Sequence, residues 1–597
     1  MEQTLVQYAW RTLSLEWLAG PILDKELRVS SRRRRNYVLR FTYLALLTVF
    51  LILVWIEETQ YTGGTALYRI SRMGRAGQAI VAFIIWFQFC ATQGFAAIAL
   101  STSINDEICH RTLGTLMTTP VSSLQIVMGK LLSKLLQAIL LLAVSLPLLA
   151  IVRVFGGVPW DYVLSSLCMT LTTVIFVALL SMLFSIFNRR AYAAVIMTAV
   201  ALGILFGAVP GLIALTYEAV RDRWPSPFWV AVMLSPNPYA TMFINTISMI
   251  EPRAGVGMPF VIWPIHCAIM LGASAVLMIV CVSIVRKVAL RQAVGQSGLL
   301  FGGKARRETG SAASAVRRAK RGGLRRVAGP AVLWKELHSP FLGLRKVLTC
   351  IAVFAALAML LVSYGLFADE GMLDERETHI LYAIIFTALG ILIAVILPAT
   401  TIASEKEAQS WPLLLTTTLG DWQIVLGKFL GVMRQCLAGW LLLLAHVAVF
   451  ILMGLMHPLA LLQVAMLVVW VTVFLASAGI YFSARFKHVA TALVANFAMA
   501  GAVWALLPLF MALLAAIGRA GYGWVETYMD TNPFVHVVCT MSAAAGTDQL
   551  RPYYWIGLGN LNAGETMLWM LFCMLTYVSA GVLLLWRAKC RLRRNIF

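Results

Sequence analysis

Charged side chains are scarce in this chain. Only 12% of its 597 residues are Asp, Glu, Lys or Arg, whereas 60% are hydrophobic. A soluble domain carries about 25% charged residues, so a chain solvated mainly by water is excluded. The charges present are unbalanced, since 48 Lys and Arg residues stand against 26 Asp and Glu residues and give a formal net charge of +22. The basic residues cluster beside apolar runs, which favours a membrane surface over nucleic acid as their partner.

Several chemical signatures are missing as well. The ten cysteines form no C-x-x-C pair, so neither a zinc site nor a disulfide framework is predicted. The N-terminus has no basic stretch leading into an apolar core, so we expect no cleaved signal peptide. A phosphate-binding loop of the form GxxxxGK[ST] is also missing, because Gly129-Lys130 and Gly427-Lys428 are each followed by a bulky apolar residue. We therefore expect no cofactor, no metal and no ATP hydrolysis in this chain.

Long apolar runs dominate what is present. About 20 apolar residues are needed to cross the hydrocarbon core of a bilayer, and about twelve runs meet that length. The sequence thus predicts an all-α polytopic membrane protein. The expected spans are Tyr37–Ile56, Gln78–Ser101, Val127–Val152, Val163–Phe187, Tyr192–Tyr217, Phe260–Val285, Val347–Phe367, Ile380–Ala403, Val425–Met453, Leu461–Phe482, Val489–Ile517 and Thr566–Trp586.

The loops between these runs differ in charge. Basic residues gather in alternate loops, and the cytoplasmic side of a membrane protein is the side rich in Lys and Arg. This pattern predicts a bacterial inner (plasma) membrane protein with both termini in the cytoplasm. Six spans in each half give the two halves one orientation, which makes them a parallel repeat. The expected units are residues 1–290, a basic linker of residues 291–328, and residues 329–597.

The two halves are most clearly similar in a polar stretch that follows the second span of each half. The stretch from Asp106 to Lys130 recurs from Ser404 to Lys428 with the same spacing. In each copy, apolar residues three and four positions apart predict a short surface helix with one apolar face. The first helix is expected to end at Pro120 and the second before Gly420. The main matching pairs are Glu107/Glu405, Thr118/Thr416, Thr119/Thr417 and Lys130/Lys428, and each lysine lies where the third span begins.

Two further elements occur once in each half. Lys-Glu-Leu precedes the first span of each half, at Lys25–Leu27 and Lys335–Leu337, and predicts an amphipathic helix in the membrane interface. Asn-Pro occurs between the fifth and sixth spans, in Ser235–Ala240 and Thr531–His536, and predicts a chain break. The aromatic residues around both Asn-Pro pairs favour short re-entrant or interfacial helices at the outer face.

The pattern E-x-x-x-R-T-L-x-x-L-x-T-T-P, from Glu107 to Pro120, followed by Gly129-Lys130, resembles the membrane subunit of a type 2 ABC exporter. The resemblance covers nearly the whole chain and implies two fused six-span halves, each with an elbow helix and a coupling helix. It implies that separate ABC ATPase subunits, two per permease, bind ATP and Mg²⁺ and dock on the coupling helices. The implied coupling-helix residues are Glu107, Arg111, Thr112, Thr118, Thr119, Pro120, Glu405, Glu407, Ser410, Thr416 and Thr417, and the implied elbow residues are Lys25, Glu26, Lys335 and Glu336. The second copy departs from the pattern at Pro412, so its helix is expected to be shorter.

Two other functions match the sequence less well. An ion-coupled secondary transporter needs titratable groups inside its spans, and the sequence offers chiefly His266 and His446, each expected to be an isolated packing residue. A lipid-linked transferase needs clustered acidic or imidazole groups, and the acidic run Asp369–Glu377 has no partner cluster, so we interpret it as an exposed loop. The apolar spans favour lipids, amphiphiles or drugs as the substrate of an exporter.

Overall fold

The computed structural model describes residues 16–31, 34–60, 66–101, 103–104, 121–153, 157–187, 191–211, 213, 232, 234–250, 263–293, 329–338, 346–369, 371–518, 521–545 and 550–593. Over these residues the chain is helical apart from one two-stranded hairpin. Ten helical segments there are long and apolar enough to cross a membrane. The prediction of an all-α polytopic membrane protein is confirmed.

The first half contains the helices α2 (Glu16–Ser31), α3 (Arg34–Gln60), α4 (Ala66–Ser101), α7 (Ser123–Arg153), α8 (Trp160–Phe187), α9 (Ala191–Gly203), η1 (Ile204–Ala208), α12 (Pro238–Ile250) and α13 (Trp263–Ala293). Over the described residues, each of the six expected spans coincides with one helix, or with α9 and η1 together. Helix α3, in the place of the first span, has a shorter apolar part, Arg40–Ile56.

The second half repeats this order. Its helices are α15 (Ala331–His338), α16 (Lys346–Asp369), η2 (Met372–Asp374), α17 (Arg376–Thr401), α18 (Ala403–Glu407), α19 (Trp411–Leu415), α20 (Asp421–Leu452), α21 (Leu459–Arg485), α22 (Val489–Gly501), η3 (Ala502–Leu506), α23 (Leu507–Gly518), α24 (Gly523–Met529), α25 (Pro533–Ala544) and α26 (Ala563–Arg591). Helix α16 again has a shorter apolar part, Leu357–Asp369. Strands β1 (Tyr553–Trp555) and β2 (Gly559–Leu561) form the hairpin.

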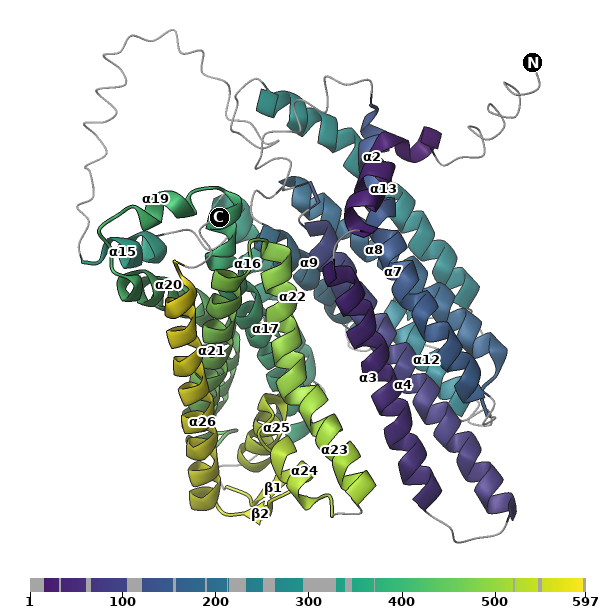
Figure 1. Ribbon diagram of the computed structural model, residues 1–597. Coiled ribbons are helices and arrows are strands. Elements are labelled where there is room, and N and C mark those ends of the chain that lie inside the picture. Colours follow the sequence, from purple (N-terminus) through teal and green to yellow (C-terminus); the bar gives the residue numbers. More distant parts are fainter. Residues whose placement is uncertain are drawn as a thin grey trace.

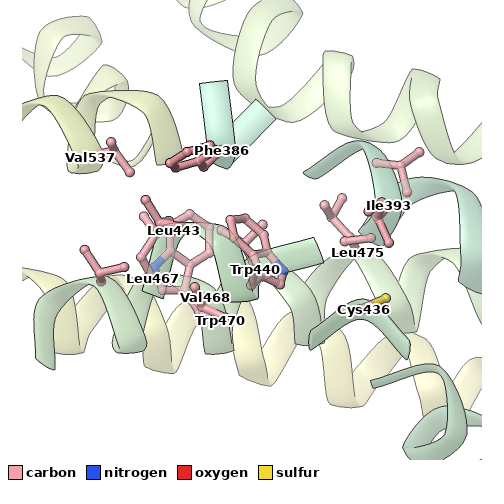
Figure 2. Close-up of a cluster of buried hydrophobic side chains, with 14 of the residues drawn as sticks. Phe386, Ile393, Cys436, Trp440, Leu443, Leu467, Val468, Trp470, Leu475 and Val537 are labelled. Carbon is pink, nitrogen blue, oxygen red and sulfur yellow. The ribbon is translucent and has the colours of Figure 1, made fainter. Parts of the chain in front are cut away.

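The largest core lies in the second half, where α17, α20 and α21 pack together. Figure 2 shows Trp440, Trp470 and Phe386 in this cluster, and both indole rings are fully buried. The close approach of α17 and α20 requires Gly390, because a Cβ atom there would lie 2.4 Å from the Trp440 ring. This packing fixes spans two and three of the second half side by side.

The two halves meet through equivalent helices. The fifth-span helix α9 of the first half packs against the second-span helix α17 of the second half, and α22 packs in turn against α4. In a two-fold interface, if the fifth span of the first half contacts the second span of the second half, then the fifth span of the second half also contacts the second span of the first half. This reciprocity supports the parallel-repeat arrangement predicted from the sequence.

The two ends of the bundle differ. Helices α2, α15 and α19 lie at one end with the C-terminus, while α24, α25 and the hairpin lie at the other (Figure 1). The short helices expected between spans five and six are present as α12, α24 and α25. The carboxylate of the buried Asp530 accepts backbone N–H bonds from Ile556, Gly557 and Leu558 at 2.9–3.0 Å. These bonds fix the hairpin to the helical layer.

Candidate functional site

The second copy of the repeated polar stretch forms a compact connection between α17 and α20. We call residues 402–420 the coupling segment. It contains α18 and α19, and the chain reverses between them at Gln409, whose φ of 57° is in the left-handed region. Pro412 stands in the first turn of α19, where its missing N–H costs nothing. Helix α19 ends at Leu415 and is five residues long, as expected for a short helix that stops before Gly420.

Glu405 is the centre of an ion-pair network in this segment. Its Oε1 atom lies 2.8 Å from the Lys335 ammonium nitrogen and 3.0 Å from that of Lys428. Lys428 also lies 3.2 Å from Glu336 Oε1. These residues come from three elements, the coupling segment, the third-span helix α20 and the elbow helix α15. The network therefore joins the coupling segment to both neighbours.

Burial differs sharply between the two lysines. The Lys428 side chain is 1% exposed and that of Lys335 is 65% exposed. A buried ammonium is tolerated only when carboxylates compensate its lost hydration, and Lys428 has two of them. Lys428 lies near the beginning of α20, and its charge is directed to protein carboxylates.

Small residues seat the elbow helix on α20. A Cβ atom added at Gly431 would lie 2.4 Å from the Cβ of Glu336, and one added at Gly427 would lie 3.1 Å from that of Val332. Glycines four residues apart form a flat stripe on one helix face, which lets another helix approach closely. Helix α15 is therefore held against α20 by shape as well as by charge.

A second set of contacts ties the coupling segment to the fourth and fifth spans. Lys406 donates its ammonium hydrogens to the backbone carbonyls of Ser483, Ala484 and Phe486. These carbonyls lie at the C-terminal end of α21, where a positive charge interacts favourably with the helix dipole. Glu407 Oε1 accepts the Val489 N–H at 2.8 Å, at the start of α22. The segment is thus attached to spans two to five of its half.

The opposite face of α19 is open. Trp411 is buried, with 1% of its surface exposed, whereas Leu413 is 72% exposed. Ser410, Thr416 and Thr417 are also exposed. The predicted apolar face of this helix is directed into the protein, and Leu413 stands outside it on the surface.

The first copy is only partly described. Glu107, Arg111, Thr112, Thr118, Thr119 and Pro120 lie outside the described residues. The described residues next to this stretch show that the elbow helix of the first half also packs against the third-span helix. Helix α2 packs along α7, with Glu26 of α2 lying 3.7 Å from the Lys134 ammonium and Lys25 exposed. Lys130 is buried and donates to the Ser103 carbonyl. Gly129 and Ser133 are buried four residues apart, like Gly427 and Gly431.

Sequence reasoning missed two sets of contacts. The carbonyl acceptors of Lys406 carry no sequence signal, because any residue provides a carbonyl. His446 was interpreted as isolated, which is wrong, since its Nε2 atom lies 3.4 Å from His379 Nδ1 and its Nδ1 atom lies 2.6 Å from the Tyr364 hydroxyl. His266 matches its interpretation as a packing residue, with Nδ1 2.8 Å from the Ser235 carbonyl.

The acidic run is exposed at Asp369, Asp374, Glu375 and Glu377, as expected, but it is only partly a loop, because Asp369 ends α16, Asp374 ends η2 and Glu377 stands in the first turn of α17. Among the described residues no group of three or more His, Cys, Asp or Glu side chains could hold a metal ion.

The fold and this site define a helical, multi-pass membrane protein with an internal repeat. Neither a scan of protein-family models nor a search of curated proteins finds a match for the chain.

Proposed function

We propose that this chain is the permease subunit of an ATP-driven exporter of the type 2 ABC class. Separate ATPase subunits, two per permease, would bind ATP and Mg²⁺ and dock on the coupling segment and on its first-half counterpart. The support is the resemblance of the duplicated polar stretch together with the way the second copy is attached. The end that carries the elbow helices would face the cytoplasm of a bacterial cell.

The observation that carries the proposal is the contrast between the two faces of the coupling segment. Its inner face is bonded to α15, α20, α21 and α22, while Leu413 of α19 and the threonines that follow this helix, Thr416 and Thr417, are open to solvent. A segment fixed in this way transmits a push on its outer face to several spans together. Such rigid-body motion is a common structural route for switching between states.

The mechanism is mechanical. ATPase subunits that close on ATP would draw the two coupling segments together, and spans two and three of each half would follow. Because spans two and five of opposite halves are in contact, this motion reaches the interface between the halves. The cargo would be a lipid, an amphiphile or a drug, in keeping with the apolar spans.

Co-purification tests this proposal. The full chain would be extracted in mild detergent and tested for a bound protein that carries a phosphate-binding loop and hydrolyses ATP. Leu413→Glu should remove the bound ATPase by placing a charge on the docking face. Leu452→Glu is the matched control, since Leu452 is 87% exposed at the far end of α20. Retention of the ATPase by both variants, or no ATPase with the unaltered chain, would contradict the proposal.

An ion-coupled transporter is the second candidate, and one observation favours it. His379, His446 and Tyr364 form a connected group of titratable side chains on α16, α17 and α20. Groups of this kind inside spans are typical of proton pathways. Vesicle transport separates the two functions, because a proton-coupled carrier works with a pH gradient and no nucleotide.

A further inference from the structure

The fifth span of each half contains a π-helical turn at the same place in the repeat. The turns are η1 and η3, residues 204–208 and 502–506, which are 298 positions apart. The coupling glutamates, at 107 and 405, have the same separation. In each turn the N–H of the following residue reaches back five residues, from Val209 to Ile204 and from Leu507 to Ala502. π turns inside α-helices frequently mark functional sites.

A proline follows each turn, at Pro210 and Pro508, again 298 positions apart. Proline has no N–H, so it cannot bond the carbonyl four residues earlier. The carbonyls that lose this donor belong to Phe206 and Trp504. Inside a membrane protein such groups need another donor.

The asparagine of each Asn-Pro motif provides that donor. Asn237 Nδ2 donates to the Phe206 carbonyl at 2.5 Å, and Asn532 Nδ2 donates to the Trp504 carbonyl at 3.3 Å. In the second half the Tyr528 hydroxyl donates to the Val503 carbonyl at 2.8 Å. The carbonyls five and four residues before Pro508 are therefore both satisfied by side chains from the connection between spans five and six.

The same asparagines also begin the short helices α12 and α25. Asn237 Oδ1 accepts the Tyr239 N–H, and Asn532 Oδ1 accepts the Phe534 N–H, both at 3.0 Å. Each side chain thus uses its oxygen to cap one helix and its nitrogen to hold the proline-freed carbonyl of another. Figure 1 shows α24 beside α23, the second part of the fifth span, while α25 packs against α17 and α21.

We propose that Pro210 and Pro508 make a joint in the fifth span of each half, and that Asn237 and Asn532 latch the short re-entrant helix to this joint. The span bends at the π turn, and the re-entrant helix follows because its first turn is bonded there. The latch requires no ATPase. Only a part for this joint in transport rests on the proposed function.

Hydrogen–deuterium exchange of the full chain in lipid nanodiscs, without ATPase, tests the latch. Asn532→Asp and Asn532→Ser keep a capping oxygen but remove the Nδ2 donor. We expect amides in 502–508 and 533–540 to exchange about tenfold faster, which corresponds to about 1.4 kcal/mol. The control is Asn562→Asp, because Asn562 caps α26 through Oδ1 in the same way and should leave both segments unchanged.

A second substitution makes the test specific. Pro508→Ala restores a backbone N–H for the Trp504 carbonyl, so Asn532→Asp should have little further effect in that background. The corresponding changes at Pro210 and Asn237 should alter amide exchange in residues 204–210 in the same way. The latch is refuted if Asn532→Asp leaves exchange at the wild-type rate, or if its effect persists in full alongside Pro508→Ala.

Discussion

Lys428 and Lys335 bind the same oxygen atom of Glu405, and their different burial predicts very different consequences of removing them. Lys428→Met leaves Glu336 and Glu405, which are 14% and 15% exposed, without their shared cation. Breaking a buried pair in this way costs about 3–5 kcal/mol. Lys335→Met removes a lysine that is 65% exposed, and an exposed pair is worth about 0–1 kcal/mol.

The assay is thermal unfolding of both variants in detergent, with a double-mutant cycle. Lys428→Met should lower the unfolding midpoint by several degrees and Lys335→Met by little. Adding Glu336→Gln and Glu405→Gln to Lys428→Met should recover much of the loss, because the carboxylate charges that Lys428 had compensated are then removed. Equal effects of the two lysine substitutions, or strict additivity with the glutamine substitutions, would show that the network does not join these elements.

Three other variants test the packing and the proposed lever. Gly390→Val should bring a side chain into steric clash with the Trp440 ring and destabilise the second half by about 1–3 kcal/mol or more, measured as a lower unfolding midpoint. Gly431→Leu should lift the elbow helix from α20, measured as faster protease cleavage near residue 338, and an unchanged cleavage rate would count against this seating. Glu107→Gln with Glu405→Gln should leave the protein inserted but separate ATP hydrolysis from transport in vesicles, and unchanged transport would argue against the lever.

The span pattern of this chain was readable from its sequence because burial in lipid imposes long apolar runs. The repeat was readable because equal spacing of Glu, Thr-Thr and Gly-Lys survives in both copies. The Asn-Pro chain breaks were also predicted correctly, since Asn532 and Pro533 stand at the N-cap and first position of α25. These features depend on residues near one another in the chain.

Contacts between distant segments were not readable in the same way. The sequence placed Lys428 at a span entry, but its burial depends on Glu336, 92 positions earlier, and on the glycine stripe that brings α15 close. The pairing of His379 with His446 depends on how α17 rotates against α20. The π turns are set by Pro210 and Pro508, and a proline alone does not reveal which carbonyl it frees or which side chain will reach it.

In the proposed mechanism, the equal separation of 298 positions has a mechanical meaning. It relates the coupling glutamates, the span-entry lysines Lys130 and Lys428, and the prolines Pro210 and Pro508. The lysine and the proline are thus 80 positions apart in both halves, so the distance along the chain from the coupling segment to the fifth-span joint is the same in each half. A pair of levers that act together on one interface must move their far ends by equal amounts. Insertions between these points would alter that balance, whereas the elbow motifs, at 25 and 335, lie outside them and are separated by 310 positions.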